Sequence, residues 1–167
     1  CEHGRYGVVM TGEELWPLVA APEPDYFAVL CGCAAYKAAV VSQEEQDAGI
    51  RLSLNLGHTV GHAVERHSGY TVSHGEAVAI GLATMARAGA ALGWCDSITA
   101  ERIKTALKRR GLPLCYRCKP EELLPYLWAD KKRQGEELTV VLPHRIGYCS
   151  LRRMKEPQLL RLLREGL

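Results

Sequence analysis

The stretch that decides the fold is residues 51–67, RLSLNLGHTVGHAVERH, followed after a short turn by residues 73–92, SHGEAVAIGLATMARAGAAL. In the first segment Arg51, Asn55, His58 and His62 are spaced by four, three and four residues, which places them along one face of a helix. Apolar residues occupy most of the remaining circumference. The pattern therefore predicts a buried helix from about Arg51 to His67 with one polar seam. Such a seam is typical of a pocket for an oxygen-rich anion, a metal ion, or both.

Two glycines accompany this seam. Gly57 and Gly61 lie four residues apart on the adjoining face of the predicted helix. Each costs about 1 kcal/mol of helix propensity relative to Ala. We expect the close approach of another helix or of a ligand to offset this cost.

The second segment begins with Ser73 and Glu76, which have the spacing of a capping box. The run that follows is apolar on nearly all sides, so we predict a central helix from Ala77 to Leu92. His74, next to the cap, could join His58 as a second nitrogen ligand, and two His with one carboxylate form a common catalytic zinc set. On spacing alone, a structural or surface role for these histidines stays open.

The rest of the chain is predicted to be mainly helical. We expect one domain, residues 1–167, with many helices and at most one small β-hairpin. Helices are predicted from Gly12 to the prolines at 22 and 24, from Asp25 to about Gln43, from Ser97 to Arg110, from Pro120, and from Glu156 to Glu165. Residues 138–142 form the strongest strand candidate, ended by Pro143, and residues 146–151 could return beside it. With no Gly-x-Gly-x-x-Gly motif, we expect no dinucleotide-binding fold in this chain.

Composition narrows the class of protein. Hydrophobic residues make up 47% and charged residues 24% of the chain, enough for a core without disulfides. The net charge of +2 and the lack of a long basic patch argue against a nucleic-acid partner. No apolar run predicts a membrane span. The odd number of cysteines, seven, favours plain thiols and a cytoplasmic protein.

Residues 54–65, LNLGHTVGHAVE, and residues 70–81, YTVSHGEAVAIG, closely resemble the signature of 3-dehydroquinate synthases. Weaker matches to this family follow the same order at residues 2–7, 36–41, 130–132, 141–143 and 146–147. The resemblance therefore covers nearly the whole chain. One departure is Arg5, which stands where the family usually has Lys and is not an equivalent donor.

The resemblance implies an enzyme of the shikimate pathway, a phosphate lyase. Such enzymes convert 3-deoxy-D-arabino-heptulosonate 7-phosphate to 3-dehydroquinate and phosphate, using NAD+ and a divalent metal, Zn2+ or Co2+. The implied metal ligands are Glu2, His58 and His74. The implied catalytic residues are Lys37, Arg51, Asn55 and His62. The implied substrate-binding residues are Arg5, Lys131 and Lys132.

The resemblance also implies a missing partner. The family's N-terminal NAD-binding half is absent from this sequence, which also has no initiator Met. We therefore expect a fragment that is inactive alone and forms a homodimer in the full-length enzyme. Two alternatives stay open: another sugar phosphate cyclase, or a non-catalytic module descended from such an enzyme. Asn55 and Glu76 favour 3-dehydroquinate synthase over its sister enzymes, and the absence of Glu after His58 disfavours a stand-alone zinc hydrolase.

Overall fold

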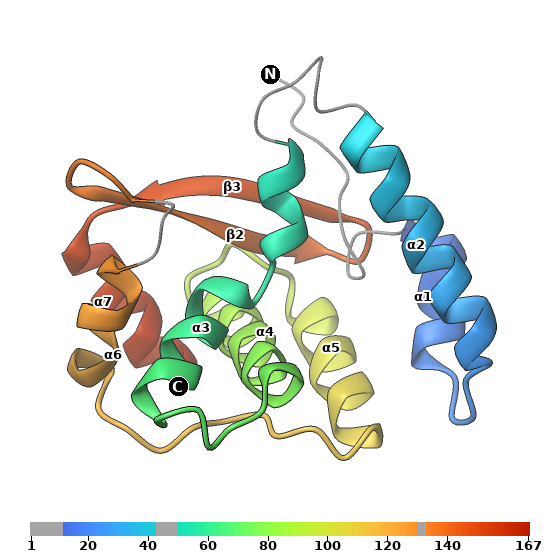
Figure 1. Cartoon of the computed structure of the whole chain (residues 1–167), viewed down its shortest axis with the longest axis horizontal. Coiled ribbons are helices and arrows are strands. Elements are labelled where there is room, and N and C mark those ends of the chain that lie inside the picture. The colour runs from blue at the N-terminus through green and yellow to red at the C-terminus, as the bar shows by residue number, and fades with distance from the viewer. Residues whose placement is uncertain (1–11, 43–49, 130–132) are drawn as a thin grey trace.

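A computed structural model describes residues 12–42, 50–129 and 133–167 of the chain (Figure 1). This part is mainly helical with a small antiparallel sheet, as predicted. Its elements in chain order are α1 (Gly12–Ala20), α2 (Tyr26–Ser42), the 3-10 helix η1 (Ile50–Asn55), α3 (His58–His67), α4 (His74–Ala91), α5 (Ser97–Arg109), α6 (Pro120–Trp128), β1 (Arg133–Gln134), β2 (Glu137–Arg145), β3 (Tyr148–Met154) and α7 (Glu156–Gly166).

Helix α4 lies at the centre of the domain, as its all-round apolar sequence predicts. It packs against α3, α5, α7 and strand β2 (Figure 1). The residues it buries are mostly small, including Ala77, Ala83, Ala86 and Ala88. Small side chains let neighbouring backbones come close, so α4 is surrounded on several sides at once.

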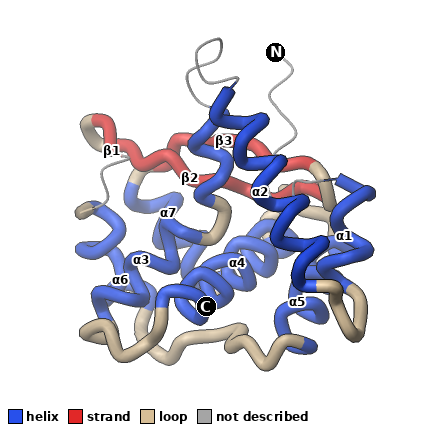
Figure 2. The backbone as a smooth tube through the Cα atoms, turned by 45° about the vertical axis from the view of Figure 1, so that its right-hand side comes forward, coloured by secondary structure: helices blue, strands red, loops and turns tan. Residues whose placement is uncertain are grey.

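The hydrophobic core lies on both sides of α4. On one side, Val64 of α3, Leu123 of α6 and Leu163 of α7 belong to the same buried cluster. On the other side, Ile103 of α5, Trp16 of α1 and residues of the hairpin form a second cluster. The strands run across the top of the helices, as Figure 2 shows.

Strands β2 and β3 form an antiparallel hairpin, and the short β1 pairs with β2. The prediction that Pro143 ends the first strand is wrong. β2 continues to Arg145, and the pairing shifts register between Pro143 and Arg145. Proline is tolerated at such an irregularity because the ladder does not need its missing N–H there. Consequently Ile146 and Gly147 form the turn, and β3 begins at Tyr148.

The predicted helix boundaries rest on the expected capping residues. Asp25 Oδ1 accepts from the Ala28 N–H at 3.0 Å at the start of α2. Pro120 occupies the first turn of α6, and Pro157 that of α7. At the other ends, Gly93 and Gly111 have φ of 72° and 68°, the left-handed conformation that stops a helix.

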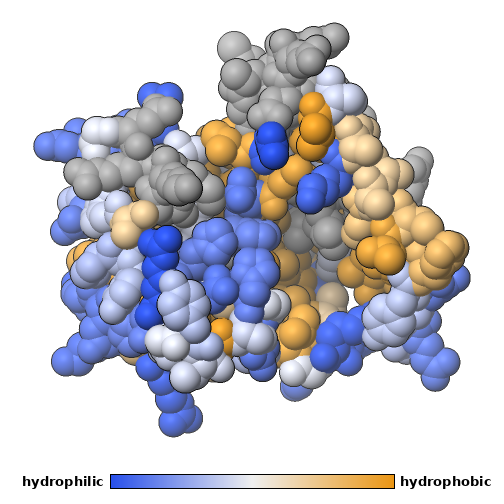
Figure 3. All heavy atoms as spheres, viewed as in Figure 1, coloured by the Kyte–Doolittle hydropathy of each residue, from blue (hydrophilic) through white to orange (hydrophobic). Residues whose placement is uncertain are grey.

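Helix α2 differs from the other long helices because most of its apolar side chains face outward. Among its residues only Val40 is buried. Tyr26, Phe27 and Leu30 are 69%, 76% and 67% exposed. Figure 3 shows apolar atoms gathered on the side of the molecule that carries α2. This face has no covering element among the described residues.

Two expectations about class can be checked on the described residues. None of the described helices combines the length and apolar character of a membrane span. The six described cysteines form no disulfide with one another. Cys1 lies outside the described residues.

Candidate metal centre

The predicted helix over residues 51–67 is in fact two elements. η1 covers Ile50–Asn55, and α3 starts at His58. Gly57 between them has φ of 79°, in the left-handed region. Only glycine adopts this conformation at little cost. The expectation of one continuous helix is therefore wrong, and Arg51 and Asn55 precede the histidine-bearing helix instead of sharing it.

The expected close approach at Gly57 and Gly61 is confirmed, and the partner is α4. A Cβ at Gly57 would lie 2.9 Å from the Leu82 nitrogen, and one at Gly61 would lie 3.0 Å from the Ala77 oxygen. From the other side, a Cβ on Gly81 would overlap the Gly57 carbonyl oxygen. Residue numbers rise along α3 while those of the facing α4 residues fall. The two helices therefore run antiparallel with their backbones in contact.

The turn between the two helices brings His74 back beside α3. Gly69 and Tyr70 both have positive φ, 61° and 63°, and the Tyr70 N–H donates to the Glu65 carbonyl at 2.8 Å. The new helix is fixed by the predicted capping box. Ser73 donates to Glu76 Oε2 through its N–H at 3.0 Å and through its hydroxyl at 2.6 Å. His74 then becomes the first residue of α4.

Three imidazoles converge where α3 meets the start of α4. The ring centroids are 5.5 Å apart for His58 and His74, 5.6 Å for His58 and His62, and 5.9 Å for His62 and His74. Two imidazoles that bind one tetrahedral zinc at about 2.0–2.1 Å have centroids roughly 5 Å apart. The His58 and His74 rings thus lie at a separation that fits a shared ion.

One nitrogen of each of two rings is already engaged. His58 Nδ1 lies 3.2 Å from the Leu56 carbonyl oxygen, and His74 Nδ1 lies 3.2 Å from Glu65 Oε2. Both oxygens only accept, so in the neutral rings each Nδ1 carries the hydrogen and each Nε2 carries the lone pair. The donor set of imidazoles with a nearby carboxylate suits Zn2+ or Co2+.

Residues 8–133 match the family described as 3-dehydroquinate synthase C-terminal. The chain belongs to this family. The matched segment includes α1–α6 and ends where the sheet begins.

Solved structures of sugar phosphate cyclases share the fold of this family member. A 2-deoxy-scyllo-inosose synthase complexed with carbaglucose-6-phosphate, NAD+ and Co2+ is 23% identical, with a TM-score of 0.65, over 87% of this chain and 43% of its own. A 2-epi-5-epi-valiolone synthase from Streptomyces hygroscopicus with NAD+ and Zn2+ bound is 19% identical, with a TM-score of 0.69, over 90% of this chain and 45% of its own. The chain thus spans less than half the length of these structures.

Three of the remaining predicted site residues lie in the described part of the chain, and four do not. Arg51 and Asn55 are on η1, and the Asn55 amide donates to the Leu52 carbonyl at 3.1 Å. Lys37 is exposed on α2, whose main contacts are with α1 and η1. The other four predicted residues lie outside the described part of the chain: Glu2, Arg5, Lys131 and Lys132. Their roles stay predictions.

Glu65 is the residue of the centre that the sequence analysis missed. The donor atoms of His62, Glu65 and His74 all lie within 4.8 Å of one another. The signal was present in the spacing, because Glu65 follows His62 by three residues and therefore shares its helical face. Glu76, in contrast, serves the cap, and its hydrogen bonds from Ser73 lower the pKa of its carboxyl below the ordinary 4.5.

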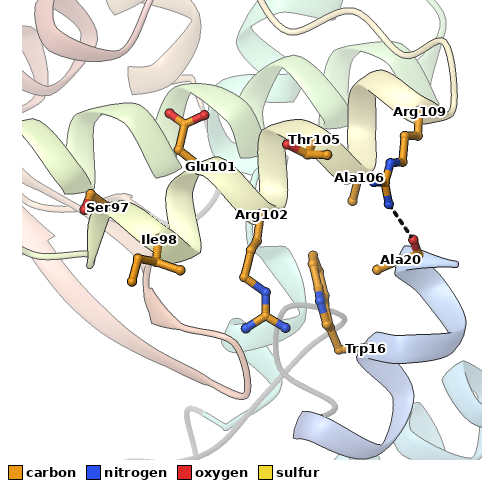
Figure 4. Close-up of a pocket in the computed structure, with 9 residues that line it drawn as sticks. All are labelled: Trp16, Ala20, Ser97, Ile98, Glu101, Arg102, Thr105, Ala106 and Arg109. Atoms are coloured by element: carbon orange, nitrogen blue, oxygen red, sulfur yellow. Dashed lines mark hydrogen bonds between the residues drawn. The ribbon is translucent and has the colours of Figure 1, made fainter. Parts of the chain in front are cut away.

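A separate hollow of about 490 Å³ lies between α1 and α5 (Figure 4). Arg102 lies over the Trp16 ring at 5.3 Å, and an Arg109 nitrogen donates to the Ala20 carbonyl at 3.2 Å. The lining residues include none of the residues predicted to bind metal or substrate. The candidate centre is therefore the histidine cluster and not this hollow.

Proposed function

We propose that this chain is the metal- and substrate-binding half of a 3-dehydroquinate synthase, which converts 3-deoxy-D-arabino-heptulosonate 7-phosphate to 3-dehydroquinate and phosphate. The observation that carries the proposal is the 5.5 Å separation of the His58 and His74 rings, with both Nδ1 atoms engaged. The motifs around these residues and the family membership support it.

In this proposal His58, His74 and Glu2 hold the divalent cation. A bound divalent cation would supply Lewis acidity, which would make a hydroxyl of the sugar easier to oxidise. His62 lies beside both metal-binding rings, where it can contact the phosphate-bearing end of the substrate. Arg51, Asn55 and Lys37 are the further proposed substrate contacts from this half. NAD+ and additional contacts belong to a separate NAD-binding half.

Metal binding provides the direct test of this centre. Titration of the chain with Co2+, followed by visible absorption, should show one site whose affinity falls in His58→Ala and in His74→Ala by more than the roughly 10–100-fold typical of losing a ligand's hydrogen-bond partner. The matched control is His67→Ala. His67 lies on the same helix, but its Nδ1 is hydrogen-bonded to the Tyr116 hydroxyl at 2.9 Å. Unchanged affinity in both His58→Ala and His74→Ala would refute the proposed centre.

A phosphate-release assay tests the need for a second half. With the heptulosonate phosphate, NAD+ and Zn2+, the chain alone should show no turnover, because the proposed NAD-binding half is not supplied by these residues. Clear turnover by the chain alone would contradict this division of roles.

A second candidate is a sister activity on another sugar phosphate, favoured by the fold shared with the two cyclases above. The two candidates differ in whether the substrate carries a carboxylate. Adding each sugar phosphate to the Co2+-loaded chain and recording the visible spectrum separates them. A change with the heptulosonate phosphate supports 3-dehydroquinate synthase. A spectral change with glucose 6-phosphate and none with the heptulosonate phosphate supports the sister activity.

A further inference from the structure

The carboxylate of Glu65 lies against the ring of His74. Glu65 Oε2 and His74 Nδ1 are 3.2 Å apart, and the side chains are 16% and 58% exposed. An exposed imidazole is thus held by a carboxylate that is itself mostly covered. A covered acceptor is better ordered than one in water, so this contact fixes the orientation of a ring that solvent alone would leave free to rotate.

The backbone of Glu65 is fixed by the turn that returns the chain to α4. Its carbonyl accepts from the Tyr70 N–H and from the Ser68 hydroxyl, each at 2.8 Å. The same residue therefore closes the end of α3 through its main chain and contacts the start of α4 through its side chain. Glu65 thus fixes the distance between α3 and α4 at the end where His74 lies.

The hydrogen bond also selects one tautomer of His74. A carboxylate only accepts, so Nδ1 carries the hydrogen and Nε2 presents its lone pair. His58 has the same tautomer, but there the acceptor for Nδ1–H is the Leu56 carbonyl oxygen. Histidines that bind metals commonly donate their second N–H to a carboxylate or a backbone carbonyl, and loss of that partner typically lowers metal affinity about 10–100-fold.

We propose that Glu65 is the positioning residue of the metal centre: it holds His74 as the Nδ1–H tautomer and aims Nε2 at the cation shared with His58. The inference rests on the proposed function, since it needs His58 and His74 as ligands. The competing arrangement is a cation bound directly by His62, Glu65 and His74, whose donor atoms lie within 4.8 Å. We favour positioning because the His58 and His74 rings are 5.5 Å apart, a separation that fits one shared ion, and the competing arrangement leaves His58 out.

The first test is the tautomer of His74 in the metal-free chain, measured by nitrogen-15 NMR of the imidazoles at about pH 8.5, where an ordinary histidine is neutral. In the unmodified chain His74 should be the Nδ1–H tautomer. Glu65→Gln keeps an acceptor and should keep this tautomer. Glu65→Ala should shift His74 toward Nε2–H, the form preferred by an unrestrained imidazole. An unchanged tautomer in Glu65→Ala would overturn the proposal.

The second test is Co2+ affinity in the same variants. Glu65→Ala should weaken binding about 10–100-fold, whereas Glu65→Gln should stay within about threefold of the unmodified chain because the amide oxygen still accepts. The matched control is Glu76→Gln, which removes a carboxylate only two residues from His74 in sequence but bonded to Ser73, and it should leave the affinity unchanged. Circular dichroism checks that each variant is folded.

The outcomes separate this inference from the function on which it rests. Loss of binding in His62→Ala and equally in both Glu65 variants, with His58→Ala unchanged, would make Glu65 a ligand and overturn the positioning role. Loss in His58→Ala and His74→Ala with no effect of Glu65→Ala would retain the proposed centre but refute this inference. If neither histidine variant loses binding, the proposed centre fails, and the metal-free tautomer still decides the role of Glu65.

Discussion

Helices α2 and α4 are both long and rich in alanine, yet they are used in opposite ways. The alanines of α4 are mostly buried, whereas Ala34, Ala35, Ala38 and Ala39 of α2 are exposed. The difference lies in their neighbours. Gly81 of α4 faces the backbone of α3, whereas the nearest described atoms to a Cβ on Gly32 of α2 belong to the flexible side chain of Leu15. A contact between two backbones leaves no room for an added Cβ, whereas a flexible side chain can move to make room for one.

This contrast separates the two parts of the proposed site. The histidines lie on α3 and α4, and these two helices pack against each other and against other described elements of the chain. Lys37 is carried by α2, whose outer apolar face is uncovered in the described part of the chain. We infer that the packing of α3 against α4 is enough to bring the proposed ligands His58 and His74 together, whereas Lys37 lies on a helix whose outer face is exposed.

The largest expected effect comes from filling the α3–α4 contact. Gly81→Ala places a Cβ onto the Gly57 carbonyl, and neither backbone can yield without separating the helices. We expect a loss of about 3 kcal/mol in the free energy of unfolding, measured by urea denaturation, together with weaker Co2+ binding. Gly75→Ala is the control, because nothing lies within 4 Å of its added Cβ. It should change stability by no more than about 0.5–1 kcal/mol. Equal effects of the two substitutions would show that the helices are not in backbone contact.

Much of the fold, but not of this contact geometry, could be predicted from the sequence. The central helix, its capping box and the glycine approach follow from periodicity and from residue type. The break at Gly57 could not, because a glycine in close helix contact and a glycine with positive φ look alike in sequence. Pro143 was misjudged for a related reason. A register shift depends on the partner strand, which local sequence does not report.

The site was predicted unevenly for similar reasons. His58, His62 and His74 come together because helical spacing and one short turn are local properties. Arg51 and Asn55 were placed on the wrong element once Gly57 broke the helix. Glu65 was missed because its link to His74 spans the turn, and its side-chain role depends on how α4 returns.

The next largest effect should appear within α2 itself. Val40 is 3% exposed, whereas Leu30 is 67% exposed. Val40→Ala should cost about 2 kcal/mol of unfolding free energy, and Leu30→Ala should stay within about 0.5 kcal/mol. Urea denaturation at several protein concentrations measures both. A large, concentration-dependent cost for Leu30→Ala would show that the outer face of α2 is covered by a second copy of the chain.

Caps at the starts of the two helices offer a finer comparison. Asp25 caps α2 and Glu76 closes the capping box of α4. Asp25→Ala should destabilise its helix by about 1 kcal/mol, and Glu76→Ala should also destabilise its helix because the Ser73 N–H loses its acceptor. For Glu76→Ala the loss should appear in global unfolding, because α4 unfolds with the core. For Asp25→Ala it should appear mainly as faster hydrogen exchange confined to α2. An equal global loss in both variants would mean that α2 unfolds only with the core.

The smallest expected effect is the pH dependence of the α4 cap. Hydrogen bonds from Ser73 lower the pKa of Glu76 below 4.5 in the folded chain, so the unfolded chain binds the proton more readily. The stabilisation is therefore fully present above the unfolded pKa and is lost as the pH falls through the folded pKa. Glu76→Gln keeps an acceptor for the Ser73 N–H but cannot titrate. The difference in unfolding free energy between the unmodified chain and Glu76→Gln should be constant above about pH 5.5 and should shrink below the ordinary pKa of 4.5. Because other carboxylates contribute equally to both proteins, a difference that stays constant down to the acid limit of folding would show that Glu76 does not hold the start of α4.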